Sequence, residues 1–121
     1  MPRQKVLVVD DSTTDLKLIS GFLSSAGYTV IKAVDGEDAL KMVQQENPDL
    51  VVLDIIMPKI NGFDVCRKIK TSADLKKTKI IMVSSKSQES DKFWGMKQGA
   101  DIYMTKPFSS EELITNVEQL F

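Results

Sequence analysis

Histidine is absent from this sequence of 121 residues, and cysteine occurs once, at Cys66. The lack of histidine excludes acid–base catalysis by imidazole and zinc sites built on histidine. A single cysteine excludes an intramolecular disulfide and offers no pair of thiolates for a metal ion. Any chemistry must therefore run on carboxylates, hydroxyls and lysines.

Long apolar runs and an excess of one charge are also lacking. No apolar run approaches the roughly 18 residues of a transmembrane helix, and the first five residues hold no apolar signal-peptide segment. The 16 basic and 17 acidic side chains give a net charge of -1, without a basic cluster that could bind nucleic acid. We therefore expect a cytoplasmic protein that binds neither nucleic acid nor membranes.

Short apolar segments rich in β-branched residues alternate with longer segments of helical periodicity. The apolar segments, which predict strands, are Lys5–Val9, Tyr28–Ala33, Leu50–Leu53, Ile80–Val83 and Ile102–Met104. Strand–helix alternation repeated five times predicts an α/β fold, a doubly wound parallel sheet with helices on both faces. Because a length of 121 residues suits one compact unit, we expect a single domain over residues 1–121.

The helical segments carry recognisable boundary signals. Ser12, with Asp15 three residues later, is typical of a helix start, and Gly27 suits the position just past the end of that helix. Phe93 and Met96 are the apolar positions of the fourth helix. We expect Phe93, like the other phenylalanines, to be buried or partly buried in the core.

Polar side chains stand directly after four of the predicted strands. In a doubly wound sheet, ligands bind beyond the carboxyl ends of the strands. The polar residues at these positions are Asp10, Asp11, Asp54, Ser84, Ser85, Thr105 and Lys106. Three carboxylates, a hydroxyl and a lysine should therefore meet at one edge of the sheet.

Clustered carboxylates repel each other and require a cation. Two unit charges about 4 Å apart interact by roughly 4 kcal/mol at an effective dielectric constant near 20. Oxygen ligands without histidine or cysteine favour Mg²⁺, and Lys106 supplies a second positive charge. Together these groups would offset the charge on a transferring phosphoryl group.

Each residue alone has an ordinary structural explanation. Asp10 or Asp11 could cap a helix, as could Ser84, and Lys106 could be a charge on a loop. Asp54 is harder to explain in this way, because it closes a strand that is expected to be central. Unrelated roles for all five residues would require five coincidences at one edge of one sheet.

Four motifs that contain these residues resemble the receiver domain of two-component response regulators, the CheY-like superfamily. The motifs are Val8–Ser12 (VVDDS), Val51–Gly62 (VVLDIIMPKING), Met82–Ser85 (MVSS) and Thr105–Phe108 (TKPF). They occur in the order and at the spacing of that family and cover essentially the whole chain. The segment Gln88–Ala100 is in turn similar to single-domain regulators of type IV pilus twitching motility, the PilH type.

The resemblance implies a role for each acidic residue. Asp54 would be the phosphoacceptor that attacks a phosphohistidine on a partner kinase. Asp11 would bind Mg²⁺ directly and Asp10 through a water molecule. Asp54 and the backbone carbonyl of Ile56 would complete the protein's share of the metal ligands.

The resemblance also implies how a phosphoryl group would be sensed. Lys106 would pair with its oxygens, Ser84 would move inward to hydrogen-bond one of them, and Tyr103 would be the aromatic switch residue. The family further implies a cis peptide bond between Lys106 and Pro107, and five strands in the order 2-1-3-4-5 with five helices in three layers.

The expected partners are a CheA-like histidine kinase and a downstream protein in motility or taxis control. The downstream protein would bind the face formed by the fourth helix, the fifth strand and the fifth helix. Trp94, in the fourth helix, is equally suited to internal packing and to a partner contact. The chain is expected to lack an output domain, to be a monomer or a weak phosphorylation-dependent dimer, and to catalyse only its own phosphorylation and dephosphorylation.

Other functions fit the sequence less well. A non-phosphorylated pseudo-receiver scaffold would not require the acidic residues and Lys106 together. An aspartyl-phosphate phosphohydrolase would place a second Asp two residues after the nucleophile, where this chain has Ile56. A flavodoxin-like nucleotide binder would have a Gly-rich or Ser/Thr-rich loop where Asp10 and Asp11 stand.

Overall fold

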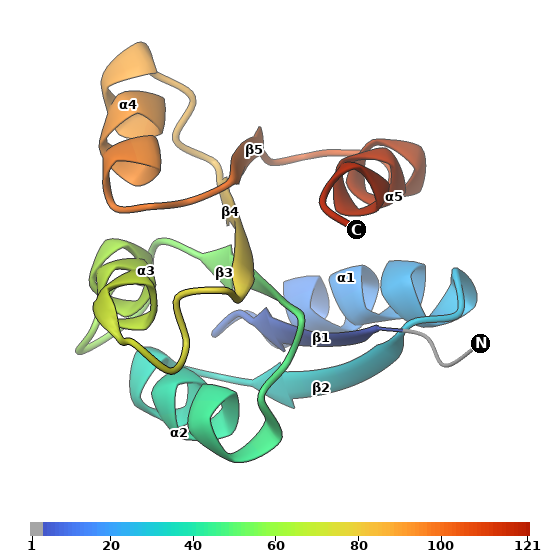
Figure 1. Cartoon of the computed structure of the whole chain (residues 1–121). Helices are drawn as coiled ribbons and strands as arrows, with labels where there is room; N and C mark the ends of the chain where they lie inside the picture. Colours follow the sequence, from blue (N-terminus) through green and yellow to red (C-terminus); the bar gives the residue numbers. More distant parts are fainter. Residues whose placement is uncertain (1–3) are drawn as a thin grey trace.

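Five parallel strands lie at the centre of the computed structural model, which describes residues 4–121 (Figure 1). The strands are β1 (Lys5–Val9), β2 (Thr29–Ala33), β3 (Leu50–Asp54), β4 (Lys79–Ser84) and β5 (Ile102–Thr105). They pair in the order β2-β1-β3-β4-β5, which confirms the doubly wound α/β fold and the expected strand order. Residues 1–3 lie outside the described residues. They belong to the expected domain range and to the N-terminal segment that is expected to lack a signal peptide.

Four strands differ from their predicted ranges by one residue at one or both ends. β2 begins at Thr29 rather than Tyr28, because the amide of Tyr28 still donates to a carbonyl of the preceding helix. The other strands gain polar residues, namely Asp54, Lys79, Ser84 and Thr105. The predicted ranges stop at the last apolar residue of each run, whereas the backbone pairing of the strands continues into the adjacent polar residue.

Helices cover both faces of the sheet. They are α1 (Thr13–Ser25), α2 (Gly36–Glu46), α3 (Gly62–Thr71), α4 (Glu89–Lys97) and α5 (Ser110–Gln119). α1 and α5 lie on one face, and α2, α3 and α4 lie on the other (Figure 1). No helix within residues 4–121 has the length and apolar composition that a bilayer crossing requires.

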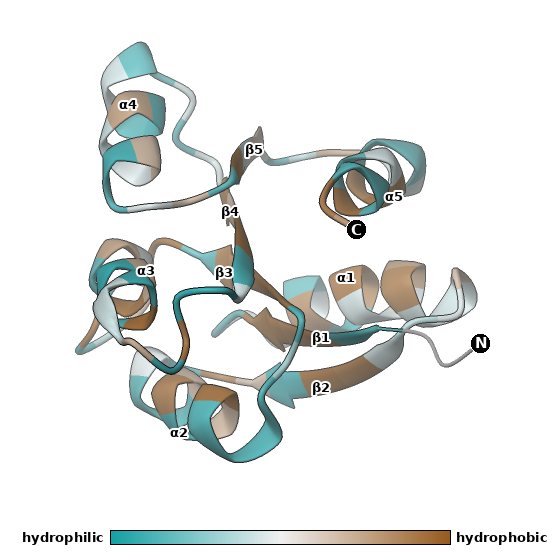
Figure 2. Cartoon of the chain, in the orientation of Figure 1, coloured by the Kyte–Doolittle hydropathy of each residue, from teal (hydrophilic) through white to brown (hydrophobic). Residues whose placement is uncertain are grey.

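Alternate side chains of each strand point to opposite faces, so the core has two parts. Leu7 and Val9 pack on the α2 and α3 side, whereas Val6 and Val8 pack on the α1 and α5 side. Burying one such side chain contributes about 1.5–3 kcal/mol. Figure 2 shows apolar residues along the strands and on the inward sides of most helices. The central strands are therefore fixed, and their carboxyl ends have defined positions.

The predicted start and end of the first helix are confirmed. The Ser12 hydroxyl accepts a hydrogen bond from the backbone N–H of Asp15 (3.3 Å), which caps α1. Gly27, two residues past the helix, has a φ of 95°, a left-handed conformation that favours glycine. The chain can therefore reverse and enter β2.

The α4 helix corrects one prediction, because Phe93 is 65% exposed and is not a core residue. Met96 and Trp94 are also about half exposed, and Gly95 is the buried residue of the helix. A Cβ atom at Gly95 would lie 2.9 Å from the sulfur of Met82. α4 approaches the sheet through a glycine, so its larger apolar side chains are turned toward solvent.

Candidate functional site

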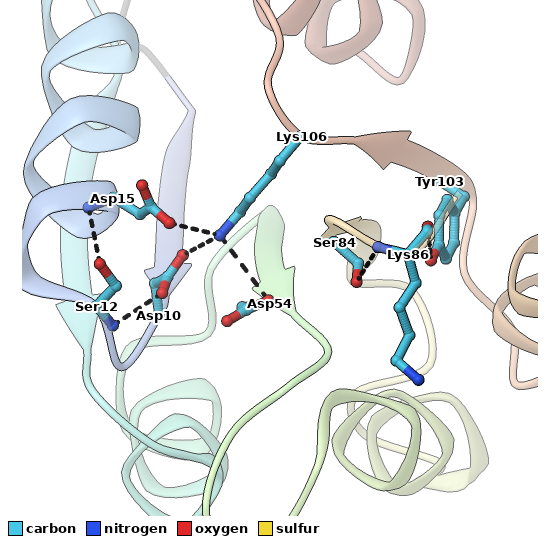
Figure 3. Close-up of polar contacts among 8 residues, drawn as sticks. All are labelled: Asp10, Ser12, Asp15, Asp54, Ser84, Lys86, Tyr103 and Lys106. Atoms are coloured by element: carbon cyan, nitrogen blue, oxygen red, sulfur yellow. Dashed lines mark hydrogen bonds and ion pairs between the residues drawn. The ribbon is translucent and has the colours of Figure 1, made fainter. Parts of the chain in front are cut away.

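The polar residues predicted to meet at the carboxyl edge of the sheet do lie together (Figure 3). Asp10 follows β1, Asp54 ends β3, and Ser84 ends β4. Lys106 follows β5 and reaches across the edge toward both aspartates. The topology brings these residues together because parallel strands end at the same edge.

Three carboxylates form a compact acidic cluster. Asp10, Asp11 and Asp54 each offer an oxygen, and these oxygens all lie within 4.8 Å of one another. Asp10 is 1% exposed and Asp54 is 7% exposed, whereas Asp11 is open to solvent. The cluster is therefore buried on its inner side and accessible to a ligand from outside.

The pKa of Asp54 is raised to about 6, mainly by burial and secondly by the negative charge of Asp10. Lys106 and the backbone of Ile56 act in the opposite direction. Burial and a neighbouring carboxylate thus both disfavour the charged form of Asp54, and a bound cation would favour it. Carboxylate oxygens without histidine or cysteine are ligands that suit Mg²⁺, so the donor set fits this ion.

The Lys106 ammonium group is bound by two carboxylates and faces a third. Its Nζ atom lies 2.9 Å from Asp10, 2.9 Å from Asp15 and 3.9 Å from Asp54. Burial by itself would lower the pKa of Lys106, but the hydrogen bonds to Asp15 and Asp10, together with the negative charges of Asp54 and Asp10, outweigh burial and raise the pKa. Lys106 is therefore a fixed positive charge beside Asp54.

Asp15 is the site residue that sequence reasoning missed. The sequence pattern indicated only a helix start, which is confirmed through the backbone N–H of Asp15, whereas the side chain of Asp15 binds Lys106. The available signal was its position in the first turn of the helix that begins just after Asp10 and Asp11. That helix end lies at the functional edge, so an acidic side chain there can reach the site.

Ser84 and Tyr103 both contact the backbone of Lys86. The Ser84 hydroxyl accepts a hydrogen bond from the Lys86 N–H (3.1 Å), and the Tyr103 hydroxyl donates to the Lys86 carbonyl (2.8 Å). Ser84 is almost fully buried. The segment after β4 therefore connects the edge of the acidic site with the side of the molecule that carries α4 (Figure 3).

Two expectations concern the backbone. The Lys106–Pro107 peptide bond is cis, as the resemblance implies. Ile56 lies two residues past Asp54, and its side chain is half exposed. The use of the Ile56 backbone carbonyl as a metal ligand stays a prediction.

Almost the whole chain matches one family model, that of the response regulator receiver domain, over residues 6–118. The chain belongs to this family. Membership implies a histidine kinase as the partner of this receiver domain in a two-component system.

Relatives and solved structures agree with the family. This receiver domain is 40% identical to protein PilH of Pseudomonas aeruginosa over 113 residues, which are 93% of each chain. It is 43% identical to the alkaline phosphatase synthesis transcriptional regulatory protein PhoP of Bacillus subtilis over 97% of this chain, but spans only 48% of that protein. The structure of the chemotaxis protein CheY4 of Vibrio cholerae superposes with a TM-score of 0.92 at 32% identity, over 98% of this chain and 99% of that chain.

The arrangement in this receiver domain suits phosphoryl chemistry. Asp54 provides a carboxylate whose raised pKa of about 6 still leaves it mostly ionised at neutral pH. Lys106 supplies positive charge on one side of it, and the other two carboxylates can hold a metal ion. A carboxylate that could act as a nucleophile thus lies beside a lysine and a possible metal site, which could both offset negative charge.

Proposed function

We propose that this receiver domain accepts a phosphoryl group on Asp54 in a two-component phosphorelay. The environment of Asp54 is the observation that supports this most directly. Its carboxylate is nearly buried at the end of a central strand, beside two further carboxylates and 3.9 Å from Lys106 Nζ. An isolated structural aspartate does not need such surroundings, whereas phosphoryl transfer depends on them.

In the proposed step, an oxygen of Asp54 attacks the phosphorus of a phosphohistidine on the kinase. The phosphorus–nitrogen bond breaks, its electron pair returns to the imidazole, and Asp54 carries an acyl phosphate. The Lys106 ammonium offsets charge on the phosphoryl oxygens during the transfer and afterwards. The chain thus catalyses only its own modification and, by hydrolysis of the acyl phosphate, its reversal.

The proposed metal ligands are Asp10, Asp11, Asp54 and the backbone carbonyl of Ile56. When bound, Mg²⁺ would offset negative charge on the phosphoryl oxygens. Asp11 is exposed and free to ligate directly. Asp10 already accepts hydrogen bonds from Lys106 and from a backbone amide, which favours contact through a water molecule.

The proposed signal is a rearrangement of the segment from β4 to β5. The Ser84 hydroxyl would leave the Lys86 amide and bond a phosphoryl oxygen. The Tyr103 hydroxyl contacts the same Lys86, so movement of this segment changes the surroundings of Tyr103 as well. Exposed Phe93 and Met96 support an output surface on the α4–β5–α5 face.

The proposed pathway is motility or taxis control in the cytoplasm, with a CheA-like kinase as donor. The support is the likeness to PilH and to the chemotaxis protein CheY4, together with the resemblance to twitching-motility regulators. A weak dimer of the phosphorylated form through the output face is part of the proposal. The downstream partner is expected to be a protein.

Intact-mass spectrometry after incubation with acetyl phosphate tests the phosphoacceptor role. We expect one phosphoryl adduct that requires Mg²⁺ and that Asp54→Asn abolishes. Asp74→Asn is the matched control, because Asp74 is an exposed aspartate between α3 and β4. This control should carry the same adduct as the wild type.

Each other outcome contradicts a particular part of the proposal. A wild type that folds and binds Mg²⁺ but gains no adduct would favour a pseudo-receiver scaffold. An adduct that persists in Asp54→Asn would identify another nucleophile. Sustained release of phosphate from small phosphate esters would instead support a phosphohydrolase.

A further inference from the structure

Asp15 binds the Lys106 ammonium group, the positive charge that would pair with a phosphoryl group on Asp54. The Lys106 ammonium donates hydrogen bonds to Asp15 and Asp10 at 2.9 Å each, while its distance to Asp54 is 3.9 Å, too long for a hydrogen bond. Figure 3 shows Asp15 and Asp10 on one side of the ammonium group and Asp54 on the other. In the resting protein, Lys106 is therefore held by acidic groups other than the phosphoacceptor.

The two acidic partners of Lys106 differ in how firmly they are held. The Asp10 side chain is 1% exposed, and its second oxygen accepts a hydrogen bond from the Ser12 N–H (3.0 Å). The Asp15 side chain is 38% exposed. Asp15 is therefore the partner that can release Lys106 and be solvated by water, at a small cost in free energy.

The released Asp15 side chain has room to move. Asp15 and Lys106 both line an open groove of about 300 Å³ between α1 and the segment after β5, together with Phe108. Water in this groove can solvate the carboxylate after Lys106 has turned away. The exchange of partners requires no movement of the sheet.

We propose that Asp15 is a positioning residue that competes with the phosphorylated Asp54 for Lys106. This inference rests on the proposed phosphoacceptor function. The pairing of Lys106 with Asp15 stabilises the unphosphorylated arrangement and lowers the affinity of the site for a phosphoryl group. Loss of the Asp15 charge frees Lys106 and shifts the equilibrium toward the phosphoryl-bound arrangement.

Binding of beryllium fluoride with Mg²⁺, followed by ¹⁹F NMR, tests this competition at equilibrium. Beryllium fluoride serves as a non-covalent mimic of the phosphoryl group on Asp54. Asp15→Asn should bind the probe about two- to fivefold more tightly than the wild type, the range expected for loss of a partly exposed ion pair. A merely structural role of Asp15 at the start of α1 would predict unchanged or weaker binding.

Glu112→Gln is the matched control for the helix-start role. Glu112 occupies the same position in α5 that Asp15 occupies in α1, and its N–H likewise donates to a capping serine, Ser109. This control should bind the probe like the wild type. Asp15→Glu, which keeps the charge, should remain within about twofold of the wild type.

The outcomes separate this inference from the function on which it rests. If the wild type binds the probe and Asp15→Asn binds it equally or more weakly, the competition is absent and only this inference is wrong. Tighter binding in Glu112→Gln as well would show that the effect arises from net charge alone. That result would also overturn this inference. If the wild type itself does not bind the probe, the phosphoacceptor function and the inference both fail.

Discussion

The β3–α3 and β4–α4 units have the same connectivity and lie side by side, yet they are anchored very differently. α3 buries four residues, Gly62, Val65, Cys66 and Ile69. α4 buries Gly95 alone. Phe63 of α3 and Trp94 of α4 border the same surface pocket, so the contrast arises between neighbouring helices.

The N-terminus of α4 is also less firmly held than that of α3. Asn61 caps α3 by accepting a hydrogen bond from the Asp64 N–H (3.0 Å). Gln88, at the corresponding position of α4, makes no side-chain capping bond. Of the five helices in residues 4–121, α4 is the one that lacks such a bond.

This difference in helix anchoring matches the two roles proposed for these units. The β3–α3 unit holds Asp54 in a fixed place, which suits a nucleophile that needs defined geometry. The α4 helix is held to the sheet by fewer buried groups than α3, so it can shift at lower cost in free energy. The proposed chemistry and the proposed response would thus lie in adjacent units whose helices are anchored unequally.

Side-chain truncations in α3 and α4 should give the largest difference in the free energy of unfolding. Ile69→Ala should lower the free energy of unfolding by about 2–5 kcal/mol, because it leaves a cavity in the core under α3. Phe93→Ala in α4 should change it by less than about 1 kcal/mol, because that ring is mostly in solvent. Urea denaturation of both variants measures the two values. Comparable losses would mean that α4 is anchored as firmly as α3.

Substitutions of Asp54, which ends β3, and of Ser84, which ends β4, should affect the free energy of unfolding with a different dependence on pH. The folded protein holds the pKa of Asp54 at about 6, above the ordinary value of 3.8, so ionised Asp54 destabilises the fold as pH rises through this range. Asp54→Asn should therefore stabilise the metal-free protein at pH 7.5 by up to about 3 kcal/mol, and the gain should vanish near pH 3.8.

Ser84→Ala is the control for this effect, because a hydroxyl does not titrate in that range. Its effect on the free energy of unfolding should be the same at both pH values. Denaturation of the two variants at each pH, without Mg²⁺, provides the comparison. A gain for Asp54→Asn that persists undiminished at pH 3.8 would show that charge burial is not its cause.

Alanine substitutions of the buried glycines, Gly62 in α3 and Gly95 in α4, should give the smallest difference in stability. A Cβ at Gly62 would clash with the backbone carbonyl oxygen of Asp54, whereas at Gly95 it would meet the flexible end of Met82 and the ring of Tyr103. Gly62→Ala should therefore cost about 2 kcal/mol and Gly95→Ala about 1 kcal/mol or less. Thermal denaturation measures the ranking, and a larger loss for Gly95→Ala would reverse the proposed difference in anchoring.

Much of the candidate site could be predicted because its residues follow strands. Asp10, Asp54 and Lys106 stand just after or at the end of apolar runs, and parallel topology brings such positions to one edge. Asp15 could not be found in this way, because it lies within a helix and its capping pattern already explained it. Its contact with Lys106 depends on where the loop after β5 passes α1.

The exposure of Phe93 in α4 was mispredicted for a related reason. Phe93 and Met96 have helical spacing, and helical spacing of apolar residues normally marks a buried face. The spacing cannot show that the face toward the sheet belongs to Gly95, where a Cβ atom would lie only 2.9 Å from Met82 and 3.0 Å from Tyr103. That outcome depends on side chains of β4 and β5, the strands on either side of α4, and the spacing within the helix does not report them.

The sequence by itself determined the fold class, the parallel sheet and the set of polar residues at its carboxyl edge. These features follow from hydrophobic periodicity and chain connectivity, which are local properties of the sequence. Only the tertiary structure decided which carboxylates hold Lys106, how far Asp54 is buried, and which face α4 turns outward. Those properties depend on distances between separate segments once they are packed together, and the periodicity within one segment does not encode them.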